Sequence, residues 1–455
     1  MTRRILIVAA ALSATLILVS CGGYKSGGQS SGFTNRVLAA QGVTATFASG
    51  GMVTINGFND TIPGIPALPA GTAPNLMTLS PARNIVAAFD SASNSVFASN
   101  TTTETSLGQV RLPEPSFSIS VPTSQPIGYA AVPGATVLGF PVLGAVEVMN
   151  LTAGAITNTI AVANAQTIVP TQDGSQLLVF SNDSDSITLL TPARALSGVD
   201  LSCLSNNPQG NPPPNAVCTI IPGFDRPVFA VLNGTTAYVM NCGAECGGTQ
   251  ASVQVLDLST ATPALVGAPV KVNGATYALL SGTNLYIAGR GTPTGPACAS
   301  LPNAATTAAQ FCGTLDIVNL TSMTDPYFNN PSLEIAVPDG YHDRMDISIN
   351  GQLFVGSRDC TNVGQAIIGT NPVGEVRGCL AILNTNTGAV IFPPQNGDVN
   401  GLQSFTSREV EYVAQGGIVF VYDTTIDALL INNDVPQGTI NIIGYVWDLK
   451  AIDFF

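Results

Sequence analysis

Two Asp-Arg pairs are the side chains best suited to chemistry in this sequence, and each stands just before a β-rich run. Asp343 and Arg344 follow His342, the single histidine of the chain, and Asp225 and Arg226 precede a similar run earlier in the chain. Arginine offers a planar fork of donors that suits a carboxylate or phosphate, and histidine titrates near neutral pH. Together these five residues would form a polar ligand site. The alternative is that each arginine pairs with a neighbouring aspartate or an adjacent repeat and only fixes the fold.

Signals of catalysis are otherwise few. Any His-dependent triad or multi-histidine metal site would have to include His342, and the HExxH, P-loop and haem-attachment patterns do not occur. Acidic turns at 182–185 and 396–400 could offer oxygen ligands to calcium, but they lack the spacing of a calcium loop. We therefore predict no catalytic residue, no metal and no cofactor.

Short β-strands that recur along the chain would position these side chains. One run has Asn or Asp at or next to its end, as at 253–258 and 315–320, and these residues favour turns. A second run, as at 237–241 and 285–289, follows a Gly-containing dipeptide typical of a tight hairpin. No long stretch shows helical periodicity. Several runs are continuously apolar, which favours sheets that are buried on both faces.

The spacing of these runs predicts an all-β fold, a single β-propeller of eight four-stranded blades. Residues 37–69 would supply outer strands and residues 445–453 the inner strand of one blade, so that N- and C-terminal strands pair and close the ring. Seven blades is one alternative, and another solenoid or a two-domain β-sandwich is the other. The predicted units start near Leu76, Phe117, Thr167, Val228, Thr276, Met345 and Gln403. Because inner strands all start at one face, both Asp-Arg pairs are expected at the mouth of the central channel.

The run Tyr238-Val239-Met240-Asn241, with its hairpin, resembles the YVTN-type repeat of WD40-like propellers. The resemblance covers essentially all of the chain after residue 33. It is specific for architecture and indicates little about activity. Cysteine-bearing inserts near 200–218, 242–250, 291–313 and 358–379 depart from the compact repeat.

The N-terminal residues have the pattern of an export signal. Arg3 and Arg4 precede an apolar stretch at 5–19, which is shorter than the roughly 20 residues of a membrane span, and Cys21 follows. The pattern resembles the lipobox of bacterial lipoproteins, in which this cysteine is acylated and becomes the new N-terminus. An ordinary secretory signal is the alternative.

The lipobox resemblance implies three segments: a signal peptide at 1–20, a lipidated tether at 21–33 and the propeller domain at 34–455. The tether is rich in Gly and Ser, a composition that stays flexible. Gly22 after the cysteine, rather than Asp, resembles sorting to the outer membrane. We therefore expect an exported protein that is lipid-anchored in the bacterial cell envelope, in the outer membrane.

Eight further cysteines fall along the chain as four pairs of near neighbours. We predict the disulfides 203–218, 242–246, 298–312 and 360–379, each closing a surface loop, as suits an oxidising compartment. Spacing alone does not fix the connectivity, and zinc bound by cysteines alone is the alternative, although no CxxC pair occurs. The eight residues are Cys203, Cys218, Cys242, Cys246, Cys298, Cys312, Cys360 and Cys379.

Charge and composition exclude some classes of function. Charged residues make up 9% of the chain and the net charge is −13, so a basic face for nucleic acid is not expected.

The expected function is a lipid-anchored propeller that binds or scaffolds an envelope protein without catalysis. The first alternative is an enzyme resembling propeller dehydrogenases or lyases, with a polar site at the channel mouth and His342 as acid or base. The second is a structural surface protein.

Overall fold

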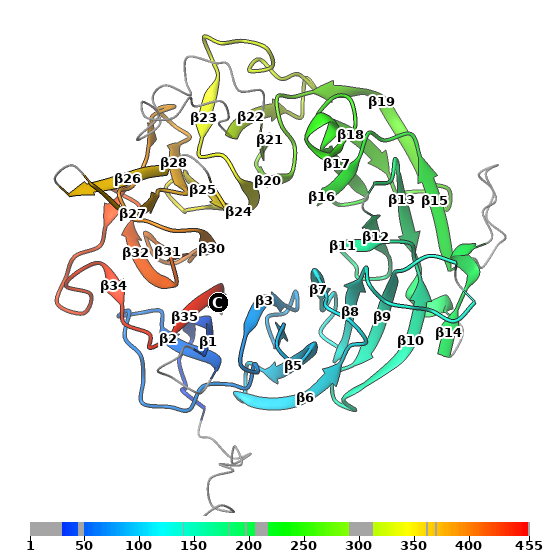
Figure 1. Cartoon of the computed structure of the whole chain (residues 1–455), viewed down its shortest axis with the longest axis horizontal. Helices are drawn as coiled ribbons and strands as arrows, with labels where there is room; N and C mark the ends of the chain where they lie inside the picture. The colour runs from blue at the N-terminus through cyan, green and yellow to red at the C-terminus, as the bar shows by residue number, and fades with distance from the viewer. Residues whose placement is uncertain are drawn as a thin grey trace, which may run out of the picture.

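Antiparallel strands follow one another in groups of about four and form a ring of blades around a central channel (Figure 1). The computed structural model describes residues 30–43, 50–139, 141–181, 183–195, 198–204, 217–290, 313–360, 363–368 and 371–453. Eight sheets make eight blades, which confirms the predicted all-β propeller and decides against seven blades. Cys21 and the predicted signal peptide lie outside the described residues.

Within a blade the chain runs from an inner strand at the channel to an outer strand at the rim. The inner strands are β3 (Pro74–Leu79), β7 (Ser118–Ser120), β11 (Ala165–Pro170), β16 (Pro227–Asn233), β20 (Tyr277–Ser281), β24 (Tyr341–Ile347), β30 (Val399–Ser404) and β35 (Tyr445–Asp453). The second strands are β4 (Ile85–Asp90), β8 (Ile127–Val132), β12 (Leu177–Ser181), β17 (Thr236–Asn241), β21 (Asn284–Gly289), β25 (Gln352–Arg358), β31 (Val410–Gln415) and β1 (Asn35–Gly42).

The outer half of each blade follows the same order. The third strands are β5 (Ser95–Asn100), β9 (Ala145–Asn150), β13 (Ser186–Leu190), β18 (Ser252–Asp257), β22 (Gly313–Asn319), β28 (Leu380–Asn384), β32 (Ile418–Asp423) and β2 (Gly51–Asn56). The outermost strands are β6 (Thr105–Arg111), β10 (Ala155–Ala161), β15 (Cys218–Pro222), β19 (Ala264–Lys271), β23 (Ile335–Val337), β29 (Val390–Ile391) and β33 (Ala428–Leu429). Additional strands are β14 (Gly198–Asp200) beside β10, β34 (Thr439–Ile440) beside β32, and the hairpin of β26 (Val363–Ile368) and β27 (Asn371–Arg377).

The predicted blade starts agree closely with the inner strands. The largest difference is at Met345 and Gln403, where β24 and β30 begin at Tyr341 and Val399. The ring closes as predicted, because the N-terminal β1 pairs with both β2 and the C-terminal β35. Closure leaves no free strand edge between the first and last blades.

The core lies between neighbouring blades. β4 and β31 are buried along their whole length, since each is covered on both faces, which explains the continuous apolar runs in the sequence. Aromatic rings join adjacent blades, as where Phe354 of β25 meets Tyr422 of β32 edge to face at 5.7 Å between centroids. No helix among the described residues is both long and apolar enough to cross a membrane.

Strand direction divides the connections between two faces of the ring. Inner strands begin, and second strands end, at the face that we call the mouth face. It carries the connections after β8 (133–144), after β17 (242–251) and after β25 (359–379). The tight hairpins between inner and second strands, such as 348–351, lie on the opposite face.

Three of the predicted disulfides are present: Cys203–Cys218, Cys242–Cys246 and Cys360–Cys379. The last two fix inserts of the mouth face. The predicted pair Cys298–Cys312 lies outside the described residues. Oxidised cysteines cannot serve as thiolate ligands, so the zinc alternative does not hold for these three pairs.

Candidate ligand site at the channel mouth

A cavity of about 520 Å³ opens where the channel meets the mouth face. Its volume falls within the ~300–1,000 Å³ typical of small-molecule sites. Every blade contributes to the lining through the beginning of its inner strand. The contributing residues, in blade order from β3 to β35, are Leu76, Ser118, Thr167, Phe229, Tyr277, Arg344, Asn400 and Trp447.

β-Bulges explain why so many side chains at this level face the channel. Six inner strands change register within their first residues, and the extra residue of each bulge lines the cavity. A bulge bends its strand and redirects a side chain, and bulges are common next to functional sites. The six bulged residues are Asn75, Gln166, Val228, Asp343, Asn400 and Trp447.

An ion-pair cluster on β24 and β25 forms one wall of the cavity. Asp343 Oδ2 lies 3.2 Å from Nη1 of Arg344 and 2.5 Å from Nη2 of Arg358. Arg344 also donates from Nε to the carbonyl oxygen of Asn400 at 2.7 Å, which ties β24 to β30. The Arg358 guanidinium lies 5.3 Å from the ring centroid of Tyr341, a cation–π arrangement. Both guanidinium groups are therefore held in fixed orientations.

The cluster perturbs the titration of its members. Burial by itself would lower the pKa of Arg344, but Asp343 and Asp448, together with two tyrosines, raise it above its ordinary value. Burial raises the pKa of Tyr277 to about 12. Both side chains therefore keep their protons at neutral pH: Arg344 is a cation and Tyr277 a neutral hydroxyl.

Polar amides form the wall across from this cluster. In the ring of eight blades β7 lies opposite β24, and β3 and β11 flank β7 (Figure 1). Asn75 of β3 and Gln166 of β11 carry amide oxygens, Oδ1 and Oε1, that are buried and have no hydrogen-bond partner among the described residues. Aromatic rings lie between the two walls, including Phe229 stacked on Tyr277 at 4.5 Å between centroids.

His342 does not face the cavity. Its side chain is 1% exposed, and Nε2 lies 2.8 Å from the carbonyl oxygen of Pro338. Burial lowers the pKa of His342 to about 4, so the ring is neutral at physiological pH. The bulge explains the placement, because its extra residue Asp343 turns towards the channel while His342 before it turns into the blade. The expectation that His342 lies at the channel mouth is therefore corrected.

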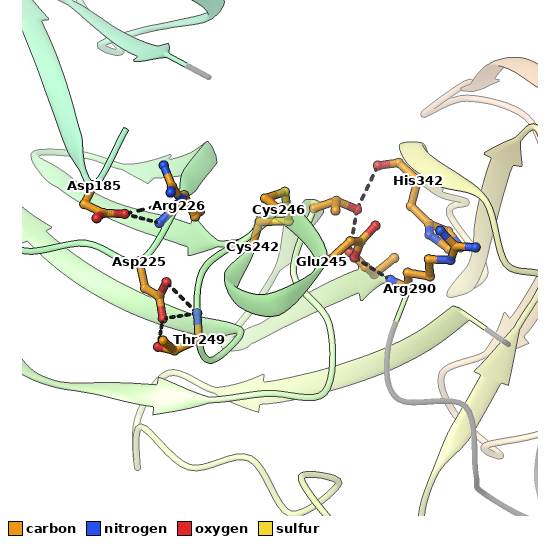
Figure 2. The surroundings of a disulfide bond; sticks show 11 residues. Asp185, Asp225, Arg226, Cys242, Glu245, Cys246, Thr249, Arg290 and His342 are labelled. Atoms are coloured by element: carbon orange, nitrogen blue, oxygen red, sulfur yellow. Dashed lines mark hydrogen bonds and ion pairs between the residues drawn. A yellow bond between two sulfur atoms is a disulfide. The ribbon is translucent and has the colours of Figure 1, made fainter. Parts of the chain in front are cut away.

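Asp225 and Arg226 also lie outside the cavity lining. Figure 2 shows them beside the Cys242–Cys246 disulfide, with Asp225 facing Thr249 and Arg226 facing Asp185. Asp225 accepts hydrogen bonds from the backbone amides of Thr249 and Gln250 and so fixes the turn that carries the Cys242–Cys246 disulfide. Burial is the largest single effect and would raise the pKa of Asp225, but the hydrogen bonds from the Thr249 hydroxyl and the two amides, with the charge of Arg226, together lower it. Arg226 Nε lies 3.7 Å from Asp185 Oδ1.

The two Asp-Arg pairs differ in their position relative to the bulge. Asp225 precedes the bulged Val228 by three residues, whereas Asp343 is itself the bulged residue. The structure thus brings Asp343 and Arg344 to the cavity and leaves Asp225 and Arg226 in the preceding connection, so the expected meeting of the two pairs does not occur. The ligand-binding role of Asp343 and Arg344 stays a prediction.

Sequence analysis missed several lining residues. Arg358 ends the second strand of its blade, and Asn75, Gln166 and Tyr277 stand at the start of inner strands that were otherwise located correctly. Aligning the repeats on their inner strands would have placed these positions at one level of the channel. No group of three or more metal-binding side chains occurs among the described residues.

Comparison with solved structures supports the architecture. Dihydro-heme d1 dehydrogenase NirN in complex with DHE matches with a TM-score of 0.57 at 10% sequence identity, covering 93% of this chain and 76% of that one. Apo AztD from Citrobacter koseri matches with a TM-score of 0.52 at 11% identity, covering 92% of this chain and 97% of that one. At such identities the similarity shows the propeller fold alone. No protein-family model and no curated protein sequence matches the chain.

Proposed function

We propose that this chain is a lipid-anchored propeller of the bacterial outer membrane that binds an envelope protein through its mouth face, without catalysis. The YVTN-type repeat and the lipobox at Cys21 support the class of protein and its location. The observation that carries the proposal is that two disulfide-fixed inserts stand on the same face of a closed ring, around the channel cavity.

The inserts have the properties of a preorganised interaction surface. The turn at 242–251 is held by its own disulfide and by Asp225, which binds Thr249 and Gln250. The Cys360–Cys379 disulfide joins the two ends of the segment that contains the β26–β27 hairpin. Loops whose conformation is fixed before binding lose less entropy when a partner docks.

The environment of His342 favours binding over catalysis. The enzyme alternative requires this histidine to transfer a proton at the channel mouth. Its ring is buried and bonded to Pro338, and its pKa of about 4 makes it a weak base. The charged groups that do reach the cavity, Asp343, Arg344 and Arg358, are paired with one another. Such a cluster can bind and orient a ligand.

The proposed anchor has a direct test. In a Gram-negative host, Cys21→Ala should abolish incorporation of labelled palmitate and release the protein from the membrane fraction. Cys203→Ala would serve as the control, because it removes a cysteine without changing the lipobox. Membrane association that persists in Cys21→Ala without any label would contradict lipid anchoring.

The binding function is tested by crosslinking the full-length protein in native membranes, followed by purification and mass spectrometry. A single envelope protein should be recovered reproducibly, with its crosslinks at residues of the mouth face. Crosslinks confined to the opposite face, or to copies of this chain alone, would contradict the proposal. The second of these results would favour the structural surface protein.

A further inference from the structure

We infer that the channel-mouth cavity is a binding site for a small planar aromatic carboxylate that carries a hydroxyl at its far end. This inference goes beyond the proposed function: it concerns a small molecule inside the channel and requires no protein partner.

The anionic end of the ligand is assigned to the wall formed by β24 and β25. Two guanidinium groups, of Arg344 and Arg358, face the single carboxylate of Asp343, which leaves one net positive charge in a chain of net charge −13. The nearby carboxylate of Asp448 is paired with Lys450 at 3.0 Å. A ligand carboxylate would therefore complete the charge balance of this wall, in the planar geometry that arginine favours.

Specific donor atoms remain for such a carboxylate. The hydrogen bonds of Arg344 within the described residues use Nε and Nη1, so its Nη2 is available. Arg358 donates from Nη2 to Asp343, and its Nη1 is likewise available among the described residues. Tyr341 belongs to the same wall.

The far end of the ligand is assigned to the opposite wall. Asn75 and Gln166 line the cavity from β3 and β11, which flank the strand opposite β24. A side-chain amide both donates and accepts hydrogen bonds, so it pairs well with a hydroxyl, which does the same. A ligand with an anion at one end and a hydroxyl at the other would match both walls.

The body of the ligand is assigned to the aromatic side chains between the walls. Phe229 and Tyr277 stack on each other in the lining, and Trp447 lines the cavity from the closing blade. Tyr, Phe and Trp make up only 6% of the chain, so several of them around one cavity is a marked concentration. Flat aromatic surfaces favour a planar, conjugated body.

The test uses the purified full-length protein and 4-hydroxycinnamate as the probe. Trp447 is the only tryptophan of the chain and lines the cavity, so its fluorescence reports occupancy of this site directly. Titration calorimetry on the same samples gives the affinity. We expect binding with a Kd below about 1 mM. 4-Hydroxycinnamyl alcohol, which lacks the carboxylate, and cinnamate, which lacks the hydroxyl, should each bind at least tenfold more weakly.

Variants separate this site from binding elsewhere. Arg358→Gln changes a half-buried side chain. It should weaken the binding of 4-hydroxycinnamate at least tenfold and leave the binding of 4-hydroxycinnamyl alcohol unchanged. Arg344→Gln should do the same, and Arg111→Gln on the exposed end of β6 is the matched control that should bind normally. Circular dichroism checks that each variant is folded.

Two results would overturn the inference: no saturable binding of 4-hydroxycinnamate by the folded wild type, or binding that Arg358→Gln leaves unchanged. Neither result bears on the envelope partner, whose capture is measured separately by crosslinking. Loss of partner capture with intact 4-hydroxycinnamate binding would contradict only the proposed function.

Discussion

Nε2 of His342 donates a hydrogen bond to the carbonyl oxygen of Pro338 across 2.8 Å, inside a blade and away from the channel. The other ring nitrogen, Nδ1, is buried without a hydrogen-bond partner among the described residues. Protonation would place a second N–H at this atom, where nothing accepts it. The neutral ring is therefore part of the packing of this blade.

This geometry predicts how stability depends on pH. The pKa of His342 is about 4 in the folded protein against 6.5 in the unfolded chain, so its contribution to stability is complete above pH 6.5. That contribution is lost as the pH falls from 6.5 to 4, by about 3 kcal/mol in all. Because the chain has one histidine, NMR of histidine-labelled protein gives this pKa from a single signal. A value near 6.5 would contradict the buried placement.

Glu411 predicts a pH dependence of the opposite sign. Its side chain is 0% exposed, and burial, together with the charge of Asp346, raises its pKa well above the ordinary value despite a backbone contact with Gln403. The folded state keeps a proton that the unfolded chain releases above about pH 4.5, so the stabilisation present at low pH is lost as the pH rises. Glu411→Gln should thus be the more stable protein at pH 8, by about 1 kcal/mol or more. Urea unfolding at pH 5 and pH 8 measures this difference, and a variant that is less stable at pH 8 would refute the prediction.

Closure of the ring depends on a buried ion pair between the last two blades. Asp60 lies in the connection after β2. Its carboxylate accepts hydrogen bonds from Nη1 and Nη2 of Arg408, at 2.8 and 3.0 Å, and from the hydroxyl of Tyr412. Asp60→Ala would remove the carboxylate partner of Arg408, which keeps its hydrogen bond to the Gly57 carbonyl, and should lower the free energy of unfolding by about 2–3 kcal/mol. The control is Asp434→Ala at an exposed position, which should change it by less than about 0.5 kcal/mol. Equal effects of the two substitutions would show that this pair does not hold the closing blade.

The stabilisation by each disulfide should increase with the logarithm of the number of residues in the loop that it closes. The Cys360–Cys379 bond spans 19 residues and the Cys242–Cys246 bond spans 4. In the chain-entropy description, replacing both cysteines by alanine should cost about 3 kcal/mol for the first pair and about 2 kcal/mol for the second. Chemical unfolding compares the two variants. Peptide mapping without reduction checks the pairing itself, and Cys242 joined to any residue other than Cys246 would contradict the structure.

Sequence patterns predicted the architecture well because all eight blades of the propeller have the same packing requirements. Each blade needs two covered strands and tight turns, so apolar runs and Gly-containing dipeptides recur at regular intervals. The closing blade could be predicted because 445–453 has the pattern of an inner strand without partners in its own part of the chain. β35 and its pairing with β1 confirm that interpretation.

The candidate site was predicted only in part, because bulges change the register of the inner strands. A bulge changes which residue of an inner strand faces the channel, and it leaves no clear mark in the sequence. Asp343 and His342 therefore could not be assigned to opposite sides from periodicity alone, and the Asp225 pair looked equivalent to the Asp343 pair. Arg358 reaches Asp343 from the neighbouring strand, a contact that depends on pairing in three dimensions.

Site-specific photo-crosslinking in living cells tests whether the mouth face binds an envelope protein. A photoreactive phenylalanine analogue replaces Leu138, which is 91% exposed in the mouth-face insert after β8, or Ile349, which is 57% exposed in a hairpin of the opposite face. If the mouth face binds the partner, a discrete crosslinked protein is expected from position 138 and none from position 349. A partner captured from position 349 and not from position 138 would contradict it.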